Sequence, residues 1–319
     1  MPRILVVAPN WIGDALMAQP LLARLREKRP DAPIDVLAPE WVAPVVRRMP
    51  EVSEVIAAPF RHGRLQLRER WRLGRRLRGL HAQAIVLPNT WKSALVPFFA
   101  DIPLRSGYVG ESRYGLLNLL YKKQDSTMNL HYARLSAPPG TEPPTPLPQP
   151  QPRLEVSAGE IAAVKAKFGL RSPYVALCPG AEYGPAKRWP YFGDLSRKIP
   201  LEKAILGSGG DAEAAQGIEG ANLAGRTSLD EAIVLLAGAA QVVSNDSGLM
   251  HVAAALGRPQ VALFGSSSPE HTPPQSTAAR VLWLRLECSP CFARECPLGH
   301  FRCMRDISVQ QVLTELGRL

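Results

Sequence analysis

The residues best suited to chemistry lie in one short stretch, 242–256, which reads VVSNDSGLMHVAAAL. A β-branched run ends at Asn245 and Asp246, and an alanine-rich helical pattern begins at once with Ser247 and Gly248. Free N–H groups at a helix start favour a negatively charged ligand, and glycine lets a phosphate approach the backbone closely. A carboxylate beside such a site suits sugar hydroxyls. This stretch therefore predicts a site for a phosphorylated sugar.

A second turn, CPGAEYGPAKRWP at 178–190, offers the positive charge that such a ligand needs. Lys187 and Arg188 come just before a helix expected near Trp189, where an ammonium group and backbone N–H groups suit a phosphate. The alternative is a surface loop whose basic side chains are only solvated. His251, in the helix of the first stretch, could reach the same ligand; the alternative is a packed core histidine.

A third turn, PNWIGDALMAQP, places Gly13 and Asp14 at the opening of the first expected helix. A carboxylate at the carboxyl end of a strand could act as a general base. Asp14 could equally be an N-cap that accepts backbone N–H bonds, and the two roles are compatible.

Four cysteines occur within sixteen residues near the C-terminus, in CSPCFARECPLGHFRC. Their number and the opening C-x-x-C predict a structural zinc held by thiolates, although the spacing of the second pair is looser than usual. Free buried thiols are the alternative, and a redox role is disfavoured. The four candidate ligands are Cys288, Cys291, Cys296 and Cys303.

These residues follow short apolar runs that alternate with helical patterns, which indicates α/β architecture with parallel sheets. We expect strands at 3–9, 34–39, 84–89, 174–180, 203–209, 241–246 and 260–266. We expect helices at 14–28, 41–48, 92–99, 189–198, 211–218, 229–239 and 248–256.

A proline-rich linker at about 137–152 divides the chain, since proline removes backbone donors and prevents helix. The sequence predicts two Rossmann-like doubly wound domains, 1–150 and 151–319, whose strand ends face a cleft. Neither G-x-G-x-x-G nor a Walker motif follows a strand, which disfavours dinucleotide-dependent dehydrogenases and P-loop NTPases.

The chain has 319 residues, 46% hydrophobic and 21% charged, and no apolar run long enough to span a bilayer. Its start does not resemble a signal peptide, so we expect a cytoplasmic protein with reduced cysteines. The formal net charge of +10 favours an anionic partner. Nucleic acid is disfavoured, because the basic residues lack interleaved aromatics and no reader motif is present.

Much of the positive charge lies in 61–80, which holds eight arginines and the single acid Glu69. Leu73, Leu77 and Leu80 recur at helical spacing, which predicts an amphipathic helix with an arginine face. This face could dock an anionic surface; the alternative is a solvated helix.

Together, PNWIGD with MAQPL, the stretch 88–118, CPGAEYGPAKRWP and NDSGLMHVAAAL resemble the bacterial lipopolysaccharide heptosyltransferases. These are glycosyltransferases of family 9 with the two-domain GT-B fold. The resemblance covers nearly the whole chain and is most specific in 88–118 and in GPAKRWP. Within the family, the chain most resembles the subfamily called ADP-heptose:lipopolysaccharide heptosyltransferase II.

The resemblance implies inverting transfer of heptose from ADP-L-glycero-β-D-manno-heptose to the first heptose of the inner core, on heptosyl-Kdo2-lipid A. It assigns Asp14 as base, Lys187 as diphosphate ligand and Asp246 as sugar ligand, and it requires no metal or other cofactor for catalysis. The implied donor residues are Gly180, Glu182, Tyr183, Lys187, Ser208, Asp211, Asp246, Ser247, Gly248 and His251, with Gly207, Ser208 and Asp211 on the adenosine side.

The acceptor is anionic and lies in the inner leaflet of the inner membrane, so the resemblance also implies peripheral association with that surface. The candidate acceptor residues are Asn10, Trp11, Gly13, Arg61, Arg64, Asn89, Lys92, Arg105 and Arg113. Two other functions remain open. One is heptosyltransferase I or another core heptosyltransferase with a different acceptor, and the other is a GT-B-type nucleotide-sugar epimerase.

Overall fold

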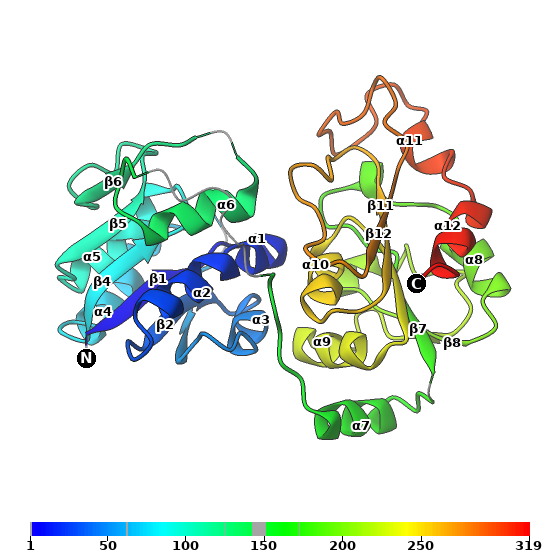
Figure 1. Cartoon of the computed structure of the whole chain (residues 1–319), viewed down its shortest axis with the longest axis horizontal. Coiled ribbons are helices and arrows are strands. Elements are labelled where there is room, and N and C mark those ends of the chain that lie inside the picture. The colour runs from blue at the N-terminus through cyan, green and yellow to red at the C-terminus, as the bar shows by residue number, and fades with distance from the viewer. Residues whose placement is uncertain (1, 62, 125, 142–150, 172) are drawn as a thin grey trace. The chain divides into compact units, whose positions relative to one another are not determined.

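The computed structural model describes residues 2–61, 63–124, 126–141, 151–171 and 173–319. The chain separates into two compact units, Met1–Pro152 and Arg153–Leu319, and each is described by itself (Figure 1). Most of the predicted linker, 142–150, lies outside the described residues. No helix in the described ranges is long and apolar enough to cross a membrane.

The first unit is built on one parallel sheet. Its strands are β1 (Arg3–Val7), β2 (Ile34–Pro39), β3 (Glu54–Ala58), β4 (His81–Val86), β5 (Leu104–Tyr108) and β6 (Leu119–Tyr121). Its helices are α1 (Ile12–Met17), α2 (Gln19–Lys28), α3 (Ala43–Arg47), α4 (Leu67–Arg76), η1 (Trp91–Ala94), α5 (Leu95–Phe99), α6 (Met128–Ala133) and η2 (Arg134–Ser136).

The second unit repeats the plan. Its strands are β7 (Tyr174–Cys178), β8 (Glu202–Ile205), β9 (Ala221–Asn222), β10 (Gln241–Asn245), β11 (Gln260–Phe264) and β12 (Ala279–Trp283). Its helices are α7 (Ala158–Lys167), η3 (Pro185–Lys187), α8 (Phe192–Lys198), η4 (Gly209–Asp211), α9 (Leu229–Gly238), α10 (Gly248–Ala255), α11 (Arg302–Arg305) and α12 (Val309–Leu316).

The two sheets share one topology. Their orders are β3-β2-β1-β4-β5-β6 and β12-β11-β10-β7-β8-β9, and every pairing is parallel. Each sheet starts at its centre, winds outward to one edge and then outward to the other, which is the Rossmann order. The predicted α/β class with two doubly wound units is confirmed.

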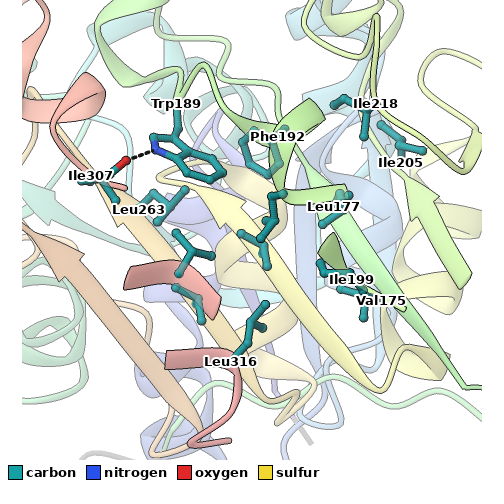
Figure 2. Close-up of a cluster of buried hydrophobic side chains, with 14 of the residues drawn as sticks. Val175, Leu177, Trp189, Phe192, Ile199, Ile205, Ile218, Leu263, Ile307 and Leu316 are labelled. Atoms are coloured by element: carbon teal, nitrogen blue, oxygen red, sulfur yellow. Dashed lines mark hydrogen bonds between the residues drawn. The ribbon is translucent and has the colours of Figure 1, made fainter. Parts of the chain in front are cut away.

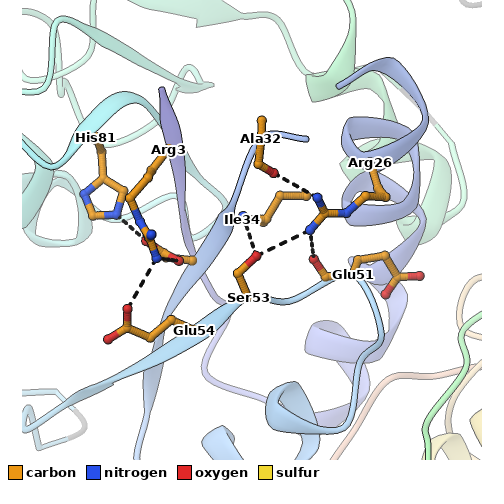
Figure 3. A network of polar contacts seen from close by, with 9 residues as sticks. Arg3, Arg26, Ala32, Ile34, Glu51, Ser53, Glu54 and His81 are labelled. Atoms are coloured by element: carbon orange, nitrogen blue, oxygen red, sulfur yellow. Dashed lines mark hydrogen bonds and ion pairs between the residues drawn. The ribbon is translucent and has the colours of Figure 1, made fainter. Parts of the chain in front are cut away.

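A polar network ties together the amino ends of the first strands (Figure 3). Asp35 on β2 is buried and accepts two hydrogen bonds from Arg3 on β1, at 2.6 Å each, and one from His81 on β4 at 2.8 Å. Arg26 on α2 donates to Glu51 O at 2.8 Å, next to the turn that leads into β3. This network lies at the amino ends of the strands and does not occupy their carboxyl ends, where α/β sheets bind ligands.

The second unit has a large apolar core on one face of its sheet (Figure 2). Val175 and Leu177 on β7 pack there with Phe192 of α8 and Leu316 of α12. Trp189 is buried in this cluster, and its Nε1 donates to Ile307 O at 2.8 Å. This core fixes the loop that runs from β7 to α8.

Three predicted helices differ in the structure. The helix expected at 14–28 is divided at Ala18 into α1 and α2, because Pro20 sits in the first turn of α2 and cannot donate a backbone hydrogen bond. The helix expected at 211–218 is a series of turns after η4. In the arginine-rich stretch, α4 ends at Arg76, so Leu80 lies beyond it and is 52% exposed.

Candidate active site

Three loops at the carboxyl ends of β7, β10 and β11 bring a lysine, an aspartate and a serine together. Lys187 Nζ lies 2.5 Å from Asp246 Oδ2, and Ser267 Oγ donates to the same oxygen at 2.5 Å. The strand order of the second sheet reverses between β7 and β10, which is where open α/β sheets bind ligands. The structure thus confirms that the two predicted turns meet.

Asn245, for which the sequence suggested no separate role, positions the loop between β7 and α8 that carries Lys187 (the lysine loop). Its side chain is buried; Nδ2 donates to Pro179 O at 2.7 Å, and Oδ1 accepts from Trp189 N at 3.1 Å. One amide therefore holds both ends of the loop that carries Lys187. The signal was present in the sequence, since Asn245 immediately precedes Asp246 at the end of a strand.

The start of α10 is open to a ligand. Ser247 is the N-cap residue and makes no side-chain cap hydrogen bond; its Oγ is 3.3 Å from Ser244 Oγ instead. Gly248 is the first helical residue and has no Cβ to keep a ligand away. The uncapped N–H groups and the helix dipole suit a phosphate oxygen.

His251 lies one turn into α10 and is buried. Burial lowers the pKa of its imidazole, while the charge of Asp246 raises it and that of Lys187 lowers it. The structure places this histidine close to the lysine and aspartate pair, in a neutral form. It is a buried residue, and its contact with a donor stays a prediction.

The ring of Tyr183, on the loop that carries Lys187, lies close to two cations from different segments. Lys187 Nζ is 4.8 Å and Arg294 Cζ is 5.3 Å from its ring centroid, and its hydroxyl donates to Phe292 O at 2.5 Å. Arg294 O also accepts a hydrogen bond from Ala186 N at 3.0 Å. The cysteine-rich segment, 288–303, therefore contacts the loop that carries Lys187 and helps to hold it in place. Glu182 is exposed beside this contact.

The turns after β7 and β8 touch each other. Asp211 Oδ2 accepts from Ser208 N at 2.9 Å and from Ser208 Oγ at 2.8 Å. A Cβ added at Gly180 would lie 2.2 Å from Asp211 Cγ, so only glycine fits there. These predicted adenosine-side residues lie together, and their contact with a nucleotide stays a prediction.

Asp14 belongs to the first unit and lies in the first turn of α1. The N-cap residue of this helix is Trp11, which makes no side-chain cap hydrogen bond, so the interpretation of Asp14 as the N-cap is wrong. Burial raises the pKa of the Tyr132 hydroxyl, and the nearby charge of Asp14 raises it further. The charge of Asp14 therefore acts on Tyr132 of α6.

The first unit also contains a pocket of about 220 Å³ at the carboxyl ends of β1, β2, β3 and β4. Three predicted acceptor residues, Asn10, Arg61 and Lys92, line it. Other wall residues were not predicted from the sequence, among them Trp41, Phe60, Arg70 and Thr90. Trp41 Nε1 donates to Asn10 O at 2.8 Å and so fixes one side of the pocket.

Other predicted acceptor residues do not belong to this wall. Arg113 is 1% exposed and donates to Tyr108 O at 2.6 Å and to Pro88 O, so it holds the surrounding loops together, and its contact with an acceptor stays a prediction. Arg105 donates to Leu116 O at 2.7 Å and to Ile102 O at 2.6 Å, which holds the loop after β5. Among the residues described, four further candidates lie outside the wall as well: Trp11, Gly13, Arg64 and Asn89.

The four clustered cysteines are free thiols. Burial and the charges of the other three raise the pKa of Cys303 to about 11. The pKa of Cys296 is lowered: burial works to raise it, but backbone N–H groups, first that of Phe301 at 3.4 Å, outweigh this. Across the described ranges, no three His, Cys, Asp or Glu side chains are grouped to hold a metal ion. The zinc site stays a prediction.

Two Rossmann-like units, with a lysine and an uncapped helix start at the switch point of the second sheet, suit an enzyme that binds a sugar attached to a nucleotide. The chain belongs to glycosyltransferase family 9 (heptosyltransferase), whose family model matches residues 70–302.

Curated relatives match over nearly their whole length. The chain is 44% identical to lipopolysaccharide heptosyltransferase 2 of Escherichia coli K12, covering 99% of this chain and 98% of the relative. It is 45% identical, with the same coverage, to lipopolysaccharide heptosyltransferase 2 of Salmonella typhimurium LT2. The solved structure of E. coli ADP-heptose LPS heptosyltransferase II is similar with a TM-score of 0.88 and 42% identity, over 99% of this chain and 98% of that one.

Proposed function

We propose that the protein transfers L-glycero-D-manno-heptose from ADP-heptose to the first heptose of heptosyl-Kdo2-lipid A, with inversion at the anomeric carbon. The observation that carries this proposal is the full-length similarity, at 44% identity, to an enzyme named lipopolysaccharide heptosyltransferase 2. The arrangement of charges in the second unit supports the same chemistry, since it suits a diphosphate attached to a sugar.

The donor half of the reaction rests on Lys187, Asp246 and the start of α10. As the bond to the anomeric carbon breaks, negative charge develops on the departing ADP. Lys187 and the N–H groups at Ser247 and Gly248 stabilise that charge. Asp246 is held by Lys187 and Ser267 and accepts hydrogen bonds from the heptose hydroxyls.

The acceptor half rests on Asp14. Its carboxylate takes the proton of the acceptor hydroxyl while that oxygen attacks the anomeric carbon from the face opposite ADP. The pocket of the first unit, with Asn10, Arg61 and Lys92 in its wall, takes the anionic inner core of the acceptor.

Beside this pocket, α4 presents a surface that suits an anionic membrane. We define this α4 surface by its exposed residues Arg64, Leu67, Arg68, Trp71, Arg72, Arg75 and Arg76. Its arginines form no ion pair with any described carboxylate, and Trp71 is 51% exposed. Arginine attracts anionic headgroups and tryptophan partitions to the membrane interface. The protein therefore acts at the inner face of the inner membrane.

A vesicle flotation assay tests this docking. Replacing Arg68, Arg72 and Arg75 with glutamine should weaken binding to phosphatidylglycerol vesicles roughly 100-fold, at about 1 kcal/mol per arginine. The control removes the same charge elsewhere, at exposed Arg47, Arg171 and Arg280. Equal loss in both triple variants would show that only net charge matters.

The experiment that tests transfer measures ADP release from ADP-heptose with and without heptosyl-Kdo2-lipid A. We expect ADP only when the acceptor is present, together with an acceptor mass increased by one heptose. Conversion of the donor sugar without acceptor would instead support a nucleotide-sugar epimerase.

A further inference from the structure

Arg70 differs from every neighbouring arginine of α4 because it points inward. Its residue is 7% exposed, whereas Arg68, Arg72, Arg75 and Arg76 are exposed. It also belongs to the wall of the pocket in the first unit. An arginine this buried is unusual unless it is paired with an acid.

The hydrogen bonds of Arg70 use only part of its guanidinium group. Nε donates to Leu65 O at 2.6 Å, and Nη1 donates to Lys92 O at 3.0 Å. Nη2 makes no hydrogen bond to the described residues. It is not completely buried, so it keeps some contact with solvent. It is thus accessible to a ligand in the pocket that Arg70 lines.

The charge of Arg70 is also unbalanced. No carboxylate in the described part of the chain forms an ion pair with it, and its Cζ lies 4.1 Å from the centroid of the Phe60 ring. Burial lowers the pKa of this guanidinium, as expected for a cation removed from water without a counter-ion. The two backbone bonds and the aromatic ring hold the group in one orientation.

A pre-oriented cation with one unused amino group is a receptor for an anion. Arginine binds planar carboxylates and phosphates through adjacent N–H donors, and such charge-assisted bonds are the strong ones. Arg61 and Lys92 in the same wall add positive charge. The walls of Trp41 and Phe60 suit the apolar face of a sugar ring.

We propose that Arg70 is the anchor for an acidic group of the acceptor, a sugar carboxylate or a phosphate, in the pocket at the carboxyl ends of β1 to β4. This inference rests on the proposed function for the identity of the acceptor. The binding of a free anion by the pocket does not depend on the proposed function.

Direct binding tests the pocket without any transfer reaction. Free Kdo, a sugar acid, and inorganic phosphate are each titrated into the full-length protein and followed by NMR of the tryptophan indole signals, since Trp41 lines the pocket. We expect binding of at least one probe, weakened about 10- to 100-fold by Arg70→Gln and less by Arg70→Lys. Arg47→Gln, an exposed arginine on α3, is the control and should bind as the wild type does. Failure of both probes to bind, or equal binding to Arg70→Gln, overturns the proposal.

Acceptor kinetics then identify the acidic group. Wild type and Arg70→Gln are compared on the natural acceptor, on one with its Kdo carboxylates methyl-esterified, and on one with its lipid A phosphates removed. We expect Arg70→Gln to raise KM for the natural acceptor about 10- to 100-fold and to leave KM for ADP-heptose unchanged. When the acidic group that Arg70 binds is blocked or removed, KM for the acceptor should rise in the wild type and stay the same in Arg70→Gln.

Fold loss is separated from ligand loss in the same experiment. A thermal melt reports the folded fraction of each variant, and a purely structural role would lower the activity on all three acceptors by one factor. That outcome contradicts the proposal. Absence of transfer by the wild type, with probe binding intact, would reject the proposed function and keep the anion site.

Discussion

Replacing Lys187 with alanine should damage both stability and donor binding, and the structure allows the two effects to be separated. The side chains of Lys187 and Asp246 are only 16% and 5% exposed, and their charged atoms are 2.5 Å apart. Removing one partner of a buried ion pair leaves an uncompensated charge and costs about 3–5 kcal/mol. For a unit of this size, the melting temperature should fall by roughly 10 °C.

The double variant Lys187→Ala/Asp246→Asn removes both charges, so most of the lost stability should return. Its affinity for ADP should stay about 10- to 100-fold below that of the wild type, because the charge-assisted bonds to the diphosphate are still missing. Calorimetric titration with ADP and a thermal melt measure the two quantities, and Lys198→Ala, an exposed lysine on α8, is the control. Wild-type ADP affinity in the stable double variant would refute the role of Lys187 in diphosphate binding.

Three further outcomes are expected. Asp14→Asn should abolish transfer while ADP affinity and the melting temperature stay unchanged, and measurable kcat in that variant would remove Asp14 as the base. Because burial lowers the pKa of His251, the unfolded chain takes up its proton near pH 6.5 and the folded chain only below that. The free energy of unfolding should therefore fall as pH drops below about 6.5, and His251→Gln should flatten this slope in denaturant titrations; an unchanged slope would show that other groups cause it. Metal analysis of untagged protein should find one zinc per chain, lost on chelation, and substoichiometric zinc would leave four free thiols: Cys288, Cys291, Cys296 and Cys303.

The central strands could be predicted from sequence because both of their faces are buried. The run at 260–266 is largely apolar, and the run at 241–246 has two valines before its polar end; they match β11 and β10 within two residues. The edge strands β3 and β12 were missed; both are only partly buried, so neither has the continuous burial of a central strand. The helices α7 and α12 were also missed, although a capping box of the form S-x-x-E or S-x-x-Q starts each.

Some features of the site could be predicted from the sequence and others could not. The turns with Lys187 and Asp246 could be recognised because each combines a strand end, glycine and a charged residue. Their contact across 59 residues depends on the order of β7 and β10 in the sheet, which no local pattern encodes. Arg70 and Arg113 could not be told from other arginines in the sequence, since only tertiary packing buries them.

The measurement that tests the central claim most directly is acceptor choice. Purified protein and ADP-heptose are incubated with an equimolar mixture of Kdo2-lipid A and heptosyl-Kdo2-lipid A, and the products are resolved by mass spectrometry. Transfer of the second heptose predicts that only heptosyl-Kdo2-lipid A gains one heptose. Addition of heptose to Kdo2-lipid A would contradict the account and identify a heptosyltransferase of the first step.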